Sequence, residues 1–445
     1  MSGRPLALGQ ARSALAEGRL SATALVQEAL AAADASQDRI RAFAAIARQE
    51  ALAAAAESDR RLATGTARPL EGLPIGVKDL IDTRGIETRY GSAAYVGNVP
   101  RADAAIVRTL VEQGAIVIGK TATHEFAWGV TTASSAFGST LNPHDPRHIP
   151  GGSSGGAAAA IACGAVAAGL GTDTGGSVRI PAALCGVAGF KPTRGVLPTQ
   201  GIFPLAPSLD HPGLLGAGVA DIVLLAGALG IGLGEHAAAA LRLGVIDAIA
   251  PVPLEDGVAA DMADALALLG RVHACGAIDS AGLFDGAFQT FAGIVLAEGG
   301  MVHFGRSDWD FIAARYGAET VDRLRRARGV ALGDYAHWQQ ERRRFAPRLE
   351  RAMRDVDYLV LPTCPCAAPR VEQSSVTIGA WTGTEREALM TYTAPFNLAG
   401  FPAISIPLPA RPGRLPTGLQ LVGRPGDDGG LLRLALRVEA LLAAG

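Results

Sequence analysis

The chain has 445 residues, of which 49% are hydrophobic and 18% are charged. This composition is too apolar for a disordered protein, and the length allows one large domain or two to three smaller ones. The formal net charge is −2, so the chain lacks the positive excess expected of a protein that binds nucleic acid or an anionic membrane surface. Five cysteines form an odd and sparse set, which favours a reducing compartment over a disulfide scaffold.

The N-terminal segment has no apolar run or cleavage site typical of a signal peptide. Two apolar stretches, 157–171 and 214–233, resemble membrane spans only at first sight. The first is too short to cross a bilayer, and the second contains Asp221 and five glycines. Both are predicted to be buried segments of one large core. We therefore expect a cytoplasmic protein with no membrane partner.

The composition of the chain changes near residue 70. Residues 10–64 show helical periodicity and many alanines, which predict a helical arm, and Ser21 and Thr23 are candidate helix caps. From residue 70, Gly and Pro become frequent. Short β-branched runs at 73–78 and 114–120 then flank a helical stretch at 102–113. This alternation predicts an α/β protein.

The rest of the chain predicts one large domain over residues 1–445. An alanine-rich helix is expected from about 156 to 168, residues 235–350 look helical, and core-like strands return near the C-terminus, where a last helix follows. The strands before and after the helical stretch are expected to share one sheet. The predicted parts are an N-terminal helical arm (1–64), a core (65–233), a variable helical excursion (234–350) and a return to the core sheet (351–445).

Lysine is rare in this sequence. Only Lys78, Lys120 and Lys191 are lysines among the 40 basic residues. Arginine stays protonated in proteins, whereas a desolvated lysine can act as a base. Lys78 follows the apolar run LPIGV, so it is the strongest candidate for such a role.

A second candidate is the turn that ends at Ser177. Consecutive glycines allow backbone conformations closed to other residues, and consecutive N–H groups in such a turn can bind an anion. A serine there could attack a carbonyl while the turn stabilises the developing oxyanion. From these residues alone, a plain glycine turn with a solvated serine is the competing interpretation.

The third candidate is GGSSGG at 151–156. It lacks the Lys-Ser/Thr of a phosphate-binding loop, and its match to the nucleophile elbow G-x-S-x-G lacks a preceding strand. His144 and His148 have a spacing that could ligate zinc, but histidines in surface loops are far commoner. We expect no metal and no cofactor.

Three segments, IGVKD, GGSSGG and DTGGSVRIP, together resemble the amidase signature family of serine hydrolases in their order and spacing. The resemblance extends to KTATHEFAWG, AGFKPTRG, FPAISIP and GLQLVG, so it covers nearly the whole chain. It implies an α/β fold in which helices cover both faces of a large mixed central β-sheet.

The resemblance also implies a catalytic triad. Ser177 would be the nucleophile, Lys78 the base, and Ser153 the bridging serine, whose peptide bond is typically cis in this family. The backbone N–H groups of Thr174, Gly175, Gly176 and Ser177 would form the oxyanion hole. The 24-residue separation from Ser177 selects Ser153 over Ser154.

Neighbours of the triad are expected to have supporting roles. Asp79 would face away from Lys78 if both lie in a strand. Asp173 and Arg179 are predicted to hold the nucleophile loop without taking part in the chemistry.

The resemblance implies an enzyme that hydrolyses the C–N bonds of small amides through an acyl-enzyme. We expect aryl or hydrophobic amides, and consider anilides, esters and carbamates (urethanes) as related substrates. The substrate-contact candidates are Phe126, Trp128, Gly129, Ile202 and Phe203. The expected partner is the small-molecule amide alone, and a homodimer is compatible with the sequence.

Two other functions stay open. One is the glutaminase subunit of a tRNA-dependent amidotransferase, because HEFAWG is similar to the corresponding segment of that subunit. The other is a non-catalytic binding protein, against which the intact Lys78, Ser153 and Ser177 argue.

Overall fold

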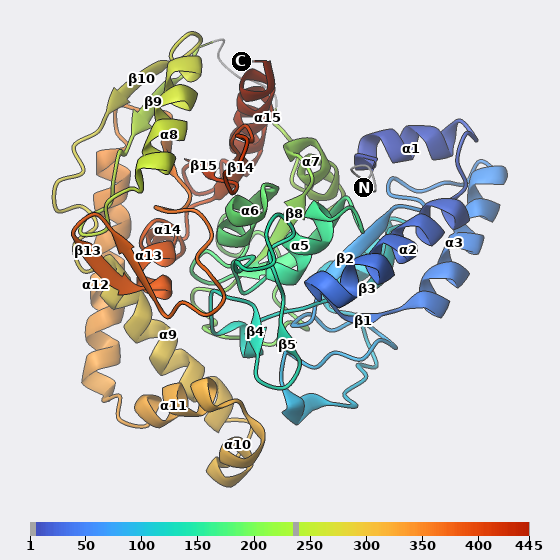
Figure 1. Cartoon of the computed structure of the whole chain (residues 1–445), viewed down its shortest axis with the longest axis horizontal. Helices are drawn as coiled ribbons and strands as arrows, with labels where there is room; N and C mark the ends of the chain where they lie inside the picture. Colours follow the sequence, from blue (N-terminus) through green and yellow to red (C-terminus); the bar gives the residue numbers. More distant parts are fainter. Residues whose placement is uncertain (1–5, 235–239, 445) are drawn as a thin grey trace.

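A mixed sheet of 11 strands runs through the protein (Figure 1). The computed structural model describes residues 6–234 and 240–444. In spatial order the strands are β1 (Phe43–Ile46), β3 (Ile116–Thr121), β2 (Pro74–Lys78), β6 (Ala168–Asp173), β8 (His211–Gly216), β7 (Ala188–Lys191), β14 (Ala403–Pro407), β15 (Gly418–Val422), β11 (Tyr358–Pro362), β9 (Arg242–Val245) and β10 (Ala274–Ala277).

Distant parts of the sequence lie side by side in this sheet. β2 pairs in parallel with β3 and β6, and the strands from β6 to β11 pair in antiparallel fashion. The core strands meet the C-terminal strands where β7 pairs with β14, with Lys191 opposite Ala403. The structure therefore places the strands on either side of the helical excursion in one sheet.

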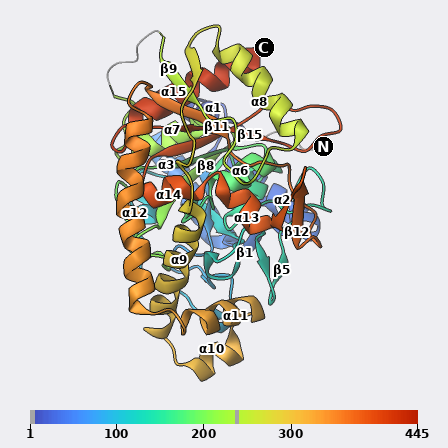
Figure 2. The ribbon, with the colours of Figure 1, turned by 90° about the vertical axis from the view of Figure 1, so that its left-hand side faces the viewer.

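Helices cover both faces of the sheet, which confirms the predicted fold class (Figures 1 and 2). One hydrophobic cluster packs beneath α1, α2, α7 and α15, and a second packs beneath α9, α13 and α14. The helices are α1 (Leu8–Ala16), α2 (Ala22–Ile40), α3 (Arg48–Ala63), α4 (Ala105–Glu112), α5 (Gly155–Ala162), α6 (Arg179–Cys185), α7 (Val219–Ala228), α8 (Asp256–Leu269), α9 (Ala287–Phe304), α10 (Trp309–Arg315), α11 (Ala318–Ala327), α12 (Leu332–Ala352), α13 (Glu385–Thr391), α14 (Ala394–Ala399) and α15 (Asp428–Ala444).

The N-terminal helices and the helices of the excursion lie at opposite ends of the molecule. Figure 1 shows α1, α2 and α3 at one end and α9 to α12 at the other, with the sheet between them. Ser21 caps α2 as expected, because its side chain accepts a hydrogen bond from Ala24 N at 3.0 Å. Thr23, the other candidate, lies inside α2 and donates its hydroxyl hydrogen to Asp59 at 2.6 Å, so it is not a cap.

Three predictions about elements need correction. The arm contains strand β1, and the excursion contains β9 and β10, which extend the sheet at its far edge. Each has only four residues, so its periodicity is too short to compete with the helical pattern around it. The alanine-rich helix α5 is also shorter than predicted. It ends before Gly164, which adopts the left-handed conformation with φ of 86°.

The two apolar stretches belong to the core. The first contains most of α5 and β6, and the second contains the end of β8 and all of α7. Asp221 is buried and accepts a hydrogen bond from Leu8 N at 2.7 Å, which accounts for a carboxylate in an apolar helix. Within residues 6–234 and 240–444, no helix has the length and hydropathy needed to span a membrane.

Candidate active site

Lys78 is the last residue of β2, a central strand that is buried along its whole length. Its ammonium group is also buried and lies 2.8 Å from Ser153 Oγ and 2.7 Å from Thr172 Oγ1. β2 and β6 are neighbours in the sheet, so Thr172 approaches Lys78 from the adjacent strand. The buried strand that ends at Lys78 thus places the amine beside the hydroxyl groups of Ser153 and Thr172.

Burial lowers the pKa of Lys78 to about 7, against the opposing effect of the Asp173 and Asp210 carboxylates. A substantial fraction of the amine is therefore neutral near pH 7. The adjacent carboxylate, Asp79, accepts hydrogen bonds from Arg89 N and Gly91 N and has Lys120 as its main charged neighbour. The prediction that Asp79 faces away from Lys78 assumed that both lie in a strand, but β2 ends at Lys78 and Asp79 lies in the turn that follows. The hydrogen bonds of Asp79 are nevertheless made to Arg89 and Gly91 and not to Lys78.

The two serines of the GGSSGG segment have different surroundings. Ser153 follows a cis peptide bond to Gly152, and its hydroxyl contacts Lys78. Ser154 instead donates its hydroxyl hydrogen to Thr172 O at 3.2 Å, and its N–H donates to Ser177 O at 3.1 Å. The Ser153 loop is therefore hydrogen-bonded both to Lys78 and to the turn that carries Ser177.

Ser177 lies in the tight turn between β6 and α6. Gly176 has a φ of 125°, and a Cβ atom there would overlap the Thr393 side chain. A Cβ at Gly175 would overlap Phe291 and Met390. The consecutive glycines thus permit both the conformation of the turn and its close packing.

The expected oxyanion hole of four N–H groups needs a correction. The Gly176 N–H donates to Asp173 Oδ1 at 2.8 Å, so it is not available to a ligand. Within the described residues, the N–H groups of Thr174, Gly175 and Ser177 have no acceptor. The turn therefore offers three N–H groups, and Asp173 uses the fourth to fix its shape.

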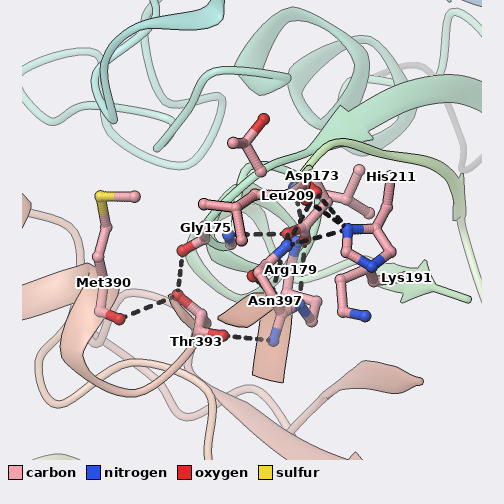
Figure 3. A network of polar contacts seen from close by, with 12 residues as sticks. Asp173, Gly175, Arg179, Lys191, Leu209, His211, Met390, Thr393 and Asn397 are labelled. Carbon is pink, nitrogen blue, oxygen red and sulfur yellow. Dashed lines mark hydrogen bonds and ion pairs between the residues drawn. The ribbon is translucent and has the colours of Figure 1, made fainter. Parts of the chain in front are cut away.

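A buried ion pair supports this turn (Figure 3). The Arg179 guanidinium donates to both carboxylate oxygens of Asp173, at 2.9 and 3.0 Å, and it keeps the pKa of Asp173 well below its usual range. Arg179 also donates to Asn397 Oδ1 and Gln420 Oε1, both at 2.6 Å. Both charges are thus satisfied, and the expected supporting roles of Asp173 and Arg179 agree with these contacts.

The C-terminal part of the chain contributes to the same support. Asn397 Nδ2 donates to the Asp173 backbone and side chain, at 2.9 and 2.8 Å. Thr393 Oγ1 donates to Gly175 O at 2.7 Å (Figure 3). Helix α14 and the residue before it therefore hold a turn that lies far away in sequence.

Ser177 lines a narrow cavity, in which the space between the atoms amounts to about 250 Å³ when the part open to solvent is included. Thr174, Gly175 and Ser177 line one side of it. Trp128 and Gly129, both predicted as substrate contacts, also line it. Sequence reasoning missed the remaining walls, which are Ala127, Leu205, Phe291, Val295, Met390 and Arg386.

A second cavity shares Thr174 with the first, and the space between its atoms amounts to about 690 Å³ when the part open to solvent is included. Ile202 and Phe203, two further predicted contacts, line it together with Asp210 and Arg306. Thr174 Oγ1 donates a hydrogen bond to Asp210 at 2.6 Å. This bond holds the side chain of Thr174, the residue that lines both cavities.

Phe126 lines neither cavity, which corrects its expected role. It is fully buried and packs against Phe203, His303 and Tyr316, with ring centroids 4.6 to 5.2 Å apart. Phe126 and Ala127 have positive φ values of 50° and 59°, and Ala127, Trp128 and Gly129 line the cavity.

Fold and site together define a hydrolase built on a mixed α/β sheet, and comparison with known proteins identifies its family. The Amidase family model matches residues 24–229 and 236–432. The chain therefore belongs to the amidase signature family, whose members hydrolyse amide C–N bonds.

Three relatives illustrate the range of similarity. A glutamyl-tRNA(Gln) amidotransferase subunit from Chloroflexus aggregans is 35% identical over 96% of this chain and 95% of its own. A crystal structure described as an amidase is 34% identical, with a TM-score of 0.90 over 98% of this chain and 100% of that one. The corresponding amidotransferase subunit from Thermotoga maritima is 29% identical, with a TM-score of 0.75 over 97% of this chain and 94% of its own.

Proposed function

We propose that this chain hydrolyses small amides with an aryl or other apolar group through an acyl-enzyme on Ser177. One observation carries the proposal: a buried lysine with a lowered pKa contacts Ser153, whose loop is hydrogen-bonded to the Ser177 turn. Anilides, esters and carbamates are related substrates that the same chemistry would accept.

The proposed reaction begins with proton transfer along the two serines. Neutral Lys78 accepts the proton of Ser153 Oγ while Ser153 accepts that of Ser177 Oγ, which attacks the substrate carbonyl. The N–H groups of Thr174, Gly175 and Ser177 stabilise the oxyanion. The relay then returns the proton to the leaving amine as the C–N bond breaks. Water releases the acid by the same route and regenerates Ser177.

The apolar walls of the Ser177 cavity support the choice of substrate. Trp128, Phe291 and Met390 offer surfaces that suit an aryl or alkyl group. The charged α-ammonium of glutamine would be desolvated there without an anionic partner in the cavity lining, at a cost of several kcal/mol.

A glutaminase subunit of an amidotransferase is the second candidate. It is favoured by the 35% identity to an amidotransferase subunit, whereas the higher TM-score to the amidase, 0.90 against 0.75 for the amidotransferase subunit, favours an amidase. The test compares benzamide with glutamine as substrates of the isolated chain. We expect the higher kcat/KM for benzamide, and the opposite order would favour the glutaminase.

The nucleophile is tested with two serine variants. Ser177→Ala should lose amide hydrolysis and labelling by a fluorophosphonate. Ser154→Ala should keep both above a trace level, because its hydroxyl contacts the backbone of β6. If the two variants behave in the reverse way, the assignment of the nucleophile is wrong.

A further inference from the structure

Arg386 is a charged residue in the otherwise apolar part of the Ser177 cavity. It is the second residue of α13, and it lines the same cavity as Ser177, Gly175 and Trp128. Its Nε is buried and has no hydrogen-bond partner in the part of the chain that the structure describes. The residue as a whole is partly exposed, but a buried guanidinium nitrogen normally has a hydrogen-bond partner, so this Nε lacks a contact that its surroundings would be expected to supply.

The charged groups around Arg386 have partners of their own. Glu319 accepts a hydrogen bond from Arg323 and lies 3.2 Å from His124 Nε2. Arg326 pairs with Asp322 at 3.1 Å.

The remaining acidic neighbour is also engaged. Glu387 accepts the Thr384 N–H at 2.9 Å and so closes the capping box of α13. No ion pair joins Arg386 to a carboxylate of the described residues.

Arg386 is nevertheless charged. Burial lowers its pKa to about 10, and Arg323 and Arg326 act in the same direction, while Glu319 and Glu387 oppose them. A group with this pKa is protonated at neutral pH. The cavity thus holds a permanent cation with at least one unused N–H donor.

We propose that Arg386 binds a carboxylate carried by the substrate, so that the enzyme acts on small amides that bear a carboxylate across an apolar spacer. This rests on the proposed amide hydrolysis at Ser177 and narrows its substrate class. A guanidinium binds a carboxylate through two parallel hydrogen bonds, which fixes the orientation of the substrate as well as its affinity. The N–H groups of the Ser177 turn and Arg386 would then hold the two ends of one molecule.

The same arrangement disfavours two other kinds of amide. A neutral amide leaves the Arg386 Nε without a hydrogen-bond partner when it expels water from the cavity. Glutamine offers a carboxylate, but its ammonium group would enter beside Arg386 and repel it. The favoured ligand therefore carries one negative charge and no positive charge.

The experiment compares 4-carbamoylbenzoate with its neutral isostere 4-isopropylbenzamide, and repeats the comparison with the monoamides of succinic, glutaric and adipic acid. We expect the wild type to prefer carboxylated over neutral amides in kcat/KM. Arg386→Met should lower kcat/KM for the best carboxylated amide about 10- to 100-fold. The preference of the enzyme for the carboxylated over the neutral amide, measured as the ratio of the two kcat/KM values, should fall by a similar factor.

Arg326→Met is the matched control. It removes a positive charge close to Arg386 from a side chain that does not line the cavity, so the preference for carboxylated amides should persist. If both variants lost the preference for carboxylated amides equally, the preference would come from the overall positive charge around the cavity, and the proposed role of Arg386 would be wrong.

A binding measurement separates this inference from the proposed function. Ser177→Ala should bind 4-carbamoylbenzoate in calorimetry, and the double variant with Arg386→Met should bind it at least tenfold more weakly. Hydrolysis of neutral amides without a carboxylate preference, or equal binding by both variants, would overturn the role of Arg386 and leave amide hydrolysis standing. Failure of the wild type to hydrolyse any amide, with Arg386-dependent binding intact, would instead contradict the proposed function alone.

Thermal unfolding of Arg386→Met tests whether Arg386 serves only to stabilise the fold. Replacing a partly buried cation that has no ion-pair partner among the described residues by an apolar side chain of similar length is expected to leave Tm unchanged or to raise it. A marked drop in the Tm of Arg386→Met would show that the residue stabilises the fold, and would count against a ligand-binding role.

Discussion

At the scale of single residues, the protonation state of Lys78 is expected to control the rate. Because burial lowers its pKa to about 7, the amine gains its basic form as the pH rises through that value. We therefore expect kcat/KM for a non-ionising amide such as benzamide to rise between about pH 6 and 8 and then to level off. A pH–rate profile measures this, and a rate that falls over the same range would contradict the assigned base.

The variant Lys78→Arg tests whether residue 78 must accept a proton. Arginine keeps the positive charge but cannot give up its proton in a protein, so it cannot accept one from Ser153. The expected loss in kcat is about 10²- to 10⁴-fold, close to that of Lys78→Ala. Steady-state kinetics on benzamide provide the comparison, with circular dichroism to check that each variant is folded. Activity like that of the wild type in Lys78→Arg would rule out the proton relay.

The residues of the site differ in how well the sequence reveals them. Lys78, Ser153 and the Ser177 turn stand in short motifs whose residue types are unusual, so each motif could be found locally. The structure brings Lys78 to Ser153 and joins the Ser153 loop to the turn. Arg386 stands in TEREALM, which looks like an ordinary capped surface helix, and only the tertiary fold brings it to the cavity.

At the scale of elements, the turn between β6 and α6 depends on one buried ion pair. Arg179→Met would leave the Asp173 carboxylate buried without its cation, at a cost of about 3–5 kcal/mol in the free energy of unfolding. Urea denaturation measures the loss. Arg48→Met is the control, because its ion pair with Asp34 is half-exposed and should change stability by less than about 1 kcal/mol. Equal effects in both variants would show that the ion pair does not stabilise the turn.

Long periodic elements were predictable, and short edge elements were not. The strands at 73–78 and 357–363 appear as β2 and β11 with small shifts in their ends, because buried central strands have dense apolar runs. β10 is the edge strand and β9 lies between it and β11; β10 is largely exposed, so little apolar pattern marks it. Its pairing with β9 depends on neighbours that the local sequence does not specify.

At the scale of the whole molecule, one sheet joins segments that the sequence places far apart. β9 from the excursion pairs with β11 from the C-terminal part, and β14 pairs with β7 of the core. Arg342 of α12 adds polar links, because its guanidinium donates to Ser208 O at 2.6 Å and to Leu398 O at 3.1 Å. These connections favour a single cooperative unit over separate domains.

We therefore expect one unfolding transition for the full chain. Trp309 and Trp338 lie in the excursion, and Trp128 lies at the Ser177 cavity, so tryptophan fluorescence reports on both regions. In urea, the fluorescence change, the loss of far-ultraviolet circular dichroism and the loss of benzamide hydrolysis should share one midpoint. If the excursion unfolded as an independent domain, fluorescence would change in two steps, and hydrolysis would follow only one of them. That result would contradict the single-domain organisation proposed for residues 1–445.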